Sequence, residues 1–374
     1  MSQIVVAPVS SRRERKLFLH FPWRHYRGDP NWIPPLRANQ KELVGFAKHP
    51  FYDDAAGQAF LATRDGEVCG RILAAVNRAH NRQYDEQRGF FGFFESTDEP
   101  DVANALFDAA CDWLRSHEMT AVRGPVNPSL NYECGLLVDG FDSPPTFMMT
   151  YNKPFYGDLI EGYGFAKSQD LYAFWGHVEM LKSLDEKLAF VAREAAERFN
   201  IHVRPFNPRR FRAELDAFLH IYNESLVDTW GFVPLSKAEV KHLGAGLKHL
   251  IVPELAIIAE VDGRPVGSTF GLLDYNPRIK QMDGRLFPFG FLKLLRRRKE
   301  LKRVRLLSTN VLPEYQRWGV GLVLVNALVP KVLDWGIEEG EFSWVLESNH
   351  LSRKTLERGG AILEKTFRIY DREL

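Results

Sequence analysis

The chain has few cysteines and no long hydrophobic segment. Its three cysteines, Cys69, Cys111 and Cys134, show neither the paired framework of secreted domains nor the short spacings of a zinc site, so we expect inert, packed thiols and no metal. The longest apolar run, WGVGLVLVNALVP at 318–330, is too short to span a bilayer and contains Asn326, which indicates a buried helix. The N-terminal apolar residues precede their basic cluster, unlike those of a signal peptide. The sequence therefore predicts a cytoplasmic protein.

An excess of charge of either sign is also absent. The 49 Lys and Arg residues nearly balance the 48 Asp and Glu residues, giving a net charge of +1. Binding to nucleic-acid phosphates needs a broad basic face, so we expect no nucleic-acid partner. Hydrophobic residues make up 45% of the chain, which is typical of a globular protein. Its 374 residues exceed the usual size of one hydrophobic core, which favours two domains.

Segments in the two halves of the chain resemble each other in the same order. FLATRDGEVCG at 60–70 matches IIAEVDGRPVG at 257–267, and each predicts a strand, an Asp-Gly turn and a second strand. Further on, NALFDAACDW at 104–113 matches NALVPKVLDW at 326–335, and both are apolar at helical spacing. Collinear matches of this kind favour a duplicated domain.

The duplication predicts one domain at 1–175 and a second at 176–374. Between its hairpin and its helix the second half has additional residues, which we interpret as a basic amphipathic insert at 277–305. Strands such as LAIIAEV at 255–261 and VRLLSTNV at 304–311 alternate with helical stretches. The sequence therefore predicts an α/β fold, duplicated in tandem, with a mixed central sheet flanked by helices in each half.

The segment VRLLSTNVLPEYQRWGVGLVLVNAL at 304–328 passes from a strand through a short loop into a helix. Gly319 and Gly321 let the backbone approach an anion without hindrance from a Cβ, and the start of the helix adds convergent N–H groups and its positive dipole end. Arg317 is placed to add a charge-assisted contact to a pyrophosphate. The alternative is a helix start whose glycines only allow close packing against the strand.

This loop resembles the acetyl-CoA motif of the GNAT superfamily, whose pattern is Gln/Arg-x-x-Gly-x-Gly/Ala, here Gln316-x-x-Gly319-x-Gly321. Glu347-Ser348-Asn349 resembles the second GNAT motif, whose Asn lies beside the pantetheine arm. The resemblance covers about residues 200–374 and implies an acyltransferase that uses acyl-CoA or acetyl-CoA. It places this co-substrate against the following residues: Asn310, Val311, Gln316, Arg317, Trp318, Gly319, Val320, Gly321 and Asn349.

The corresponding position in the first half is FESTDE at 94–99, which is acidic and has no glycine. Such a segment would repel a pyrophosphate, so we expect the domain at 1–175 to lack a CoA loop and the chain to bind one CoA. The whole chain resembles a tandem GNAT protein of bacterial type, and more weakly the bacterial ceramide synthase-type acyltransferases.

Transfer of an acyl group to an amine needs a neutral amine, a polarised carbonyl and a proton for the leaving thiolate. The resemblance implies that a backbone N–H at Val311 or its neighbours contacts the thioester oxygen. Glu347 is the candidate base, and His350 and Tyr370 are candidate acids, although a helix-cap histidine and a strand tyrosine are ordinary structural residues. The family often has a tyrosine where this chain has Leu356, which leaves a non-catalytic, acyl-CoA-binding relative as an alternative.

Two further segments are candidates for the wall of the acceptor site. The segment at 128–153 is a long stretch between turn signals and contains Asn131, Tyr132 and Glu133; an elaborate hairpin is the alternative. In the second half, Trp230 lies before the hairpin, where GNAT proteins commonly shape the acceptor pocket. Packing in the core is the alternative for Trp230.

The segment LFPFGFLKLLRRRKELKRVR at 286–305 joins an aromatic half to a basic half. If it is helical from Phe289, one face carries the apolar side chains Phe291, Leu294, Leu295 and Leu301 and the other carries the arginines. That arrangement predicts a helix lying on anionic lipid, with peripheral contact at the inner face of the membrane, and it favours a lipid or sphingoid-type amine as acceptor. The alternatives are a helix docked on the second domain and a small soluble amine or protein as acceptor.

Overall fold

The computed structural model describes residues 3–182 and 186–374, which form two compact units. The first unit comprises the chain up to Leu171 together with Asn276–Lys293 and Lys365–Leu374, and the second comprises Tyr172–Tyr275 and Leu294–Glu364. Each unit therefore contains residues from both sides of the boundary expected after residue 175. The mixed α/β fold expected from the sequence is confirmed.

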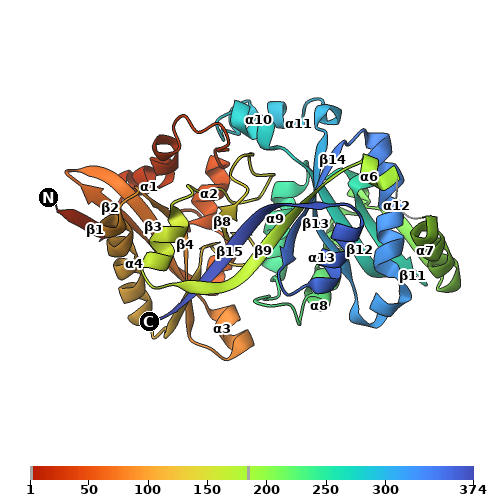
Figure 1. The fold of residues 1–374 in the computed structure, drawn as a ribbon, viewed down its shortest axis with the longest axis horizontal. Coiled ribbons are helices and arrows are strands. Elements are labelled where there is room, and N and C mark those ends of the chain that lie inside the picture. The colour runs from red at the N-terminus through yellow and green to blue at the C-terminus, as the bar shows by residue number, and fades with distance from the viewer. Residues whose placement is uncertain (1–2, 183–185) are drawn as a thin grey trace. The chain divides into compact units, whose positions relative to one another are not determined.

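The first unit is a sheet with helices packed against it (Figure 1). Its strands run in the order β1, β2, β3, β4, β5 and β15, and every pair is antiparallel except β4 with β5. Its elements are β1 (Ile4–Pro8), α1 (Arg12–His25), α2 (Arg37–Leu43), β2 (Ala55–Arg64), β3 (Glu67–Asn77), α3 (Arg78–Tyr84), β4 (Arg88–Ser96), α4 (Pro100–Arg115), β5 (Ala121–Gly124), β6 (Val126–Asn127), β7 (Glu133–Cys134), β8 (Leu136–Asp139), α5 (Tyr156–Gly162) and α10 (Asn276–Gln281).

The second unit repeats this arrangement. Its strands run in the order β10, β11, β12, β13 and β14, and again every pair is antiparallel except the parallel pair β13 with β14. Its elements are α6 (Glu179–Lys182), α7 (Glu186–Arg198), β10 (Ile201–Pro205), α8 (Phe211–Ser225), α9 (Lys237–Leu247), β11 (Ala256–Val261), β12 (Arg264–Leu273), β13 (Arg303–Val311), the 3-10 helix η5 (Pro313–Trp318), α12 (Val320–Trp335), β14 (Glu339–Leu346) and α13 (His350–Arg358).

The hairpins predicted from the two Asp-Gly pairs are both present. Asp65 and Gly66 join β2 to β3 with φ of 51° and 81°, and Asp262 and Gly263 join β11 to β12 with φ of 50° and 76°. Positive φ at both central residues is what a tight hairpin turn of this type requires, and Gly with Asp tolerates it best. The predicted helices are present as α4 and α12, each on the sheet of its own unit.

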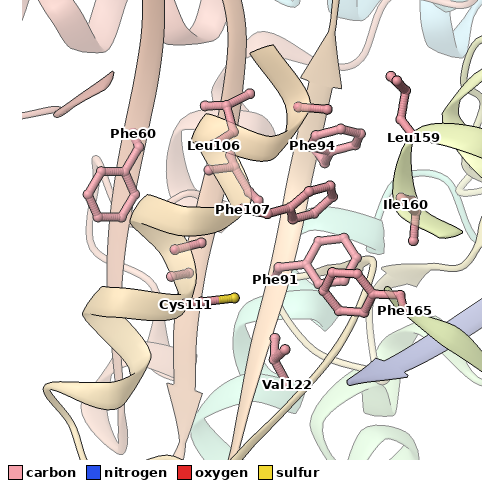
Figure 2. Close-up of a cluster of buried hydrophobic side chains, with 14 of the residues drawn as sticks. Phe60, Phe91, Phe94, Leu106, Phe107, Cys111, Val122, Leu159, Ile160 and Phe165 are labelled. Carbon is pink, nitrogen blue, oxygen red and sulfur yellow. The ribbon is translucent and has the colours of Figure 1, made fainter. Parts of the chain in front are cut away.

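The core of the first unit lies between α4 and the sheet. Helix α4 begins with Pro100 at its first position, where a missing N–H costs nothing, and it buries one face that includes Leu106 and Phe107. Phe107 packs on Phe91 from β4 and on Phe165, as Figure 2 shows. All three cysteines are buried, as the sequence predicts, and Cys111 belongs to this core.

The last strand of each half of the chain completes the sheet of the other unit. Strand β9 (Ala166–His177) follows α5 but ends in the second unit, where the indole nitrogen of Trp175 donates to Glu339 at 3.1 Å. Strand β15 (Ile362–Glu373) follows α13 but ends in the first unit, where Tyr370 to Glu373 pair with β5. The duplicated halves therefore exchange their final strands.

The prediction of a single amphipathic helix in the insert is wrong. Helix α11 covers only Gly290–Leu295, and Arg297 adopts a left-handed conformation with φ of 48° that ends the helix. Leu294 and Leu301 are buried rather than aligned on an exposed face. Arg303 and Arg305, which the sequence placed in the basic run, lie in β13 and pair with acidic residues. The periodicity failed here because it continued through a turn and into a strand.

Candidate active site

Strands β13 and β14 of the second unit pair only over their first residues. Registered pairs run from Arg303 with Glu339 to Leu306 with Phe342. Among the described residues no register joins their remaining parts, 307–311 and 343–346, and we call these unpaired ends the β13–β14 fork. Thr309 in the fork is exposed, although a central strand covered on both faces is normally buried. The fork therefore leaves backbone polar groups of β13 available to a ligand.

Buried charges fix the closed end of the fork. The Arg305 Nε atom donates to Ser343 Oγ at 2.8 Å, and the Ser343 hydroxyl donates to Glu341 Oε1 at 2.6 Å. Arg303 lies 3.3 Å from the same Glu341 carboxylate, which is completely buried. Buried charges need such partners, so these contacts hold the two strands together just before they separate. Sequence reasoning missed this cluster because Arg303 and Arg305 sit inside a basic run.

The loop after β13 has the backbone geometry of an anion site. Gly319 has a φ of 77° and caps α12, and no side chain bonds to the free N–H groups at this helix start in the described chain. A left-handed residue followed by helical residues turns successive N–H groups toward one point, where the helix dipole also favours negative charge. A Cβ built at Gly321 would meet nothing closer than Val311 Cγ2 at 3.9 Å. The loop is therefore open beside Gly321.

The other residues of the loop divide into exposed and packed side chains. Gln316 and Arg317 are exposed, and Gln316 Nε2 donates to the Val311 carbonyl at 3.4 Å. Trp318 is half-buried and stacks on Phe199 with ring centroids 4.7 Å apart. Val320 is completely buried. Arg317 therefore remains accessible to a ligand, while the packed side chains of Trp318 and Val320 anchor the loop to the core of the second unit.

Val311 presents its N–H group to the fork. The Leu312 N–H donates to the Val266 carbonyl, on the side of β12. Successive N–H groups alternate in direction along a strand, so the Val311 N–H points away from β12. This is the backbone group that the sequence analysis placed against a thioester oxygen.

The second motif follows β14 directly. The Asn349 side chain caps α13 by accepting from the Ser352 N–H at 3.1 Å, and His350 is the exposed first residue of that helix. Glu347 is half-buried, and its carbonyl accepts from Arg353 Nη1 at 3.0 Å. The structure thus gives Asn349 a structural bond in addition to the contact expected from the motif.

Tyr370, a candidate acid, and Leu356, which stands where the family often has an acidic tyrosine, both have defined surroundings. Tyr370 belongs to the first unit, where its hydroxyl donates to Glu161 at 3.0 Å, and burial raises its pKa far above the usual value. Leu356, at the position where the family often has tyrosine, packs against the apolar cluster of Phe174, Val345 and Ala361. Tyr370 and the CoA-type loop therefore belong to different units.

The four residues expected at the acceptor wall are also divided between the units. Tyr132 is buried and packs edge-on against His49, with ring centroids 5.4 Å apart. Asn131 lies next to it, its N–H donating to Ser129 Oγ at 3.3 Å, and Glu133 pairs with Asn127 between β7 and β6. Trp230 belongs to the second unit and is half-buried between α8 and α9.

The first unit closes the position that corresponds to the fork. Strands β4 and β5 pair from Arg88 with Ala121 to Phe90 with Arg123, and β6 then lies against β4 at Gly92 and Phe93. A Cβ built at Gly92 would lie 1.6 Å from the Val126 carbonyl oxygen. The Phe93 N–H donates to Asn127 Oδ1 at 2.7 Å, so a side chain of the same unit already accepts the hydrogen bond from this backbone group.

The acidic segment at 94–99 of the first unit is buried over its first three residues, which belong to β4. Glu95 is buried, and its carboxylate accepts from the hydroxyls of Tyr26 at 2.6 Å and Tyr156 at 2.7 Å. Burial raises the pKa of Glu95, and the buried Arg71 guanidinium 3.5 Å away opposes this. The Tyr156 hydroxyl also accepts from the Ser96 N–H at 3.1 Å. A packed polar network therefore fills this position.

Two known proteins resemble the chain over its whole length. It is 35% identical over 386 residues to the bacterial ceramide synthase of Caulobacter vibrioides, covering 100% of this chain and 98% of that protein. It is also 35% identical over 380 residues to Protein YghO of Escherichia coli K12, covering 100% of this chain and 96% of that protein. No known family profile matches the chain.

Among solved structures, a tandem GNAT protein from the clavulanic acid biosynthesis pathway matches 99% of this chain and 98% of its own, with a TM-score of 0.59 at 12% identity. A GCN5-related N-acetyltransferase from Sphaerobacter thermophilus matches 99% of this chain and 95% of its own, with a TM-score of 0.53 at 13% identity. These likenesses show that the chain has the tandem GNAT fold. Within that class, the chain belongs to the family that includes the bacterial ceramide synthase and Protein YghO.

No helix in the described ranges is long and apolar enough to cross a membrane. Residues 3–182 and 186–374 also contain no group of three or more His, Cys, Asp or Glu side chains arranged to hold a metal ion.

Proposed function

We propose that the second unit binds acyl-CoA and transfers its acyl group to a primary amine. The observation that carries this proposal is the left-handed Gly319 at the start of α12, which directs free N–H groups toward one point next to the β13–β14 fork. Such a site suits a pyrophosphate, and the exposed Arg317 adds positive charge. The fork suits the amide groups of a pantetheine arm, which bind to a strand edge as another strand does.

In the proposed reaction the amine nitrogen attacks the thioester carbonyl, the new C–N bond forms and the C–S bond breaks. The Val311 N–H, directed into the fork, would stabilise the oxyanion, and Glu347 would accept the proton that the amine loses. His350, exposed at the start of α13, would return a proton to the thiolate. Tyr370 is the weaker candidate, because its hydroxyl is bonded to Glu161 within the first unit.

Calorimetric titration with CoA tests the binding step. Gly319→Asp places a side chain at a φ of 77° and a carboxylate at the anion site, so we expect at least about tenfold weaker binding. Asp98→Ala, at an exposed residue of the corresponding segment of the first unit, is the matched control and should bind like wild type. We expect one CoA per chain. Two CoA molecules per chain, or unchanged affinity in Gly319→Asp with a folded protein, would contradict the proposal.

We further propose that the acceptor is a lipid amine met at an anionic membrane surface, which the likeness to a bacterial ceramide synthase supports. Four apolar side chains of one short segment are exposed: Phe287 by 76%, Phe289 by 70%, Leu292 by 53% and Phe291 by 40%. Exposed Lys293 and Arg296 follow in the chain. Apolar side chains beside basic ones suit the interface of an anionic bilayer, and clustered exposure of this kind is unusual on a soluble surface. The alternative acceptor, a small soluble amine or a protein, does not need this segment.

Sedimentation with phosphatidylglycerol vesicles tests the membrane contact. Phe287→Ser with Phe289→Ser removes two aromatic anchors and should weaken binding at least about tenfold, whereas Leu351→Ser, at a side chain exposed by 80% elsewhere, should not. Binding should also weaken as salt screens the charges. Failure of the wild-type protein to bind vesicles at low salt would instead favour a soluble acceptor.

A further inference from the structure

Two buried polar side chains stand opposite each other in the middle of the second unit. Ser268 on β12 and Asn310 on β13 are register partners, and they are 3% and 4% exposed. Within the described part of the chain, neither Ser268 Oγ nor Asn310 Nδ2 has a hydrogen-bond partner. A buried polar group without a partner destabilises the protein, so each such group needs an explanation. A pair of them, side by side, indicates a binding position.

The two side chains face away from the CoA-type loop. A Cβ built at Gly267 would touch Val320 of α12 at 2.8 Å, so the next residue, Ser268, points to the opposite face of the sheet. Two residues further along β12, Phe270 packs on Phe218 of α8 with ring centroids 5.6 Å apart. Partners in an antiparallel pair share a face, so Asn310 points toward the α8 side as well.

This position lies next to the reacting atoms of the proposed function. Asn310 immediately precedes Val311, whose N–H is directed into the β13–β14 fork. A co-substrate bound at the start of α12 occupies one face of the sheet, so the amine must approach the thioester from the other. Ser268 and Asn310 lie on that other face, at the same end of β13.

The chemistry of the pair favours an uncharged oxygen. Asn310 Nδ2 is a donor, and the Ser268 hydroxyl both donates and accepts. A hydroxyl group would satisfy both residues, because it accepts from the amide and exchanges a hydrogen bond with the serine. An ammonium group would leave the amide donor unpaired.

Building on the proposed acyl transfer, we propose that Ser268 and Asn310 form a subsite that binds a hydroxyl group of the acceptor amine and thereby selects hydroxylated acceptors.

Stability without substrate gives the first test. Ser268→Ala removes an unpaired buried hydroxyl and should raise the Tm by about 2 °C. Ser343→Ala is the matched control, because that equally buried hydroxyl is bonded to Arg305 and Glu341, and it should lower the Tm. A lower Tm in Ser268→Ala would overturn the proposal, since it would show that the hydroxyl is already paired in the free protein.

Substrate discrimination gives the second test. Acyl transfer is measured for a long-chain primary amine carrying a hydroxyl on the carbon next to the aminomethine carbon, and for the same amine without it. In the wild type the hydroxylated amine should have at least about tenfold higher kcat/KM, and both Ser268→Ala and Asn310→Leu should reduce that ratio toward one. Ser268→Ala should do so while leaving CoA affinity unchanged. Equal kcat/KM values in the wild type would overturn the subsite and leave the acyl transfer standing. Loss of CoA binding in the wild type would instead contradict the proposed function, and the Tm comparison would still decide the subsite.

Discussion

The two units share one strand order, and they differ where the parallel central pair of strands ends. In the second unit β13 and β14 continue past Leu306 and Phe342 without pairing, and the loop that follows begins a helix at the left-handed Gly319. In the first unit β6 covers β4 at Gly92, and Asn127 accepts from the Phe93 N–H. The same fold therefore carries an open position in one copy and a filled one in the other.

If the second unit binds CoA as we propose, the difference shows how a duplicated domain can lose a ligand site and keep its fold. The first unit fills this position with its own side chains, because Asn127 and Tyr156 bond to backbone N–H groups of β4. Glu95, held by two tyrosines and Arg71, fills the space beside them. Paired polar groups stabilise the first unit, whereas in the described part of the second unit Ser268 Oγ and Asn310 Nδ2 are buried without a hydrogen-bond partner.

Gly92→Ala should have the largest effect on this comparison. The new Cβ would overlap the Val126 carbonyl oxygen, which is backbone and cannot rotate away, so β6 must leave β4. We expect a loss of about 3 kcal/mol or more of unfolding free energy, measured by urea denaturation. If Gly92→Ala unfolds like wild type, β6 does not seal the first unit and the contrast between the two units fails.

The sequence predicted the elements that depend on local signals. Asp65-Gly66 and Asp262-Gly263 mark both hairpins because few other residues tolerate their positive φ, and the apolar spacing of α4 and α12 marks both helices. The family motif also singled out Gly319, which has a positive φ and begins α12. These signals come from neighbouring residues, which is why they can be read without a structure.

The features that separate the units depend on long-range contacts. Nothing near Glu95 in the sequence shows that Tyr26 and Tyr156 bury it, and nothing near Arg305 shows that Glu341 pairs with it. The exchange of β9 and β15 was not predicted for the same reason, since the sequence of a strand has the same pattern whichever sheet the strand joins. The fork is defined by where pairing stops, and periodicity carries no information about pairing.

A smaller effect should appear in the pH dependence of the first unit. Burial lowers the pKa of His25 to about 4, and its Nε2 lies 2.8 Å from the Tyr156 hydroxyl that also bonds Glu95. Between about pH 6.5 and pH 4, His25 is protonated in the unfolded chain but neutral in the folded protein. The contribution of His25 to the free energy of unfolding therefore falls as the pH falls through that window.

The raised pKa of Glu95 acts in the opposite direction, because the folded protein then binds its proton more readily as the pH falls. The effect of His25 is therefore isolated by comparing wild type with His25→Phe at each pH. After allowance for partial exposure, we expect the difference between them to change by at most about 2 kcal/mol over the window. A difference that is constant between pH 7 and pH 4 would show that His25 is hydrated and that the network in the first unit is open to water.

Gly321→Ala should have the smallest effect, and it completes the contrast with Gly92→Ala. A Cβ at Gly321 would make only an ordinary contact with Val311 Cγ2 at 3.9 Å, and the position lies in the first turn of α12. Alanine favours helix more than glycine does, so we expect an unfolding free energy between that of wild type and about 1 kcal/mol above it, with CoA affinity within about threefold. Urea denaturation and calorimetry on the two alanine variants measure both quantities. A loss of stability in Gly321→Ala as large as that in Gly92→Ala would mean that chain atoms already occupy the side of Gly321, and that the second unit is as closed as the first.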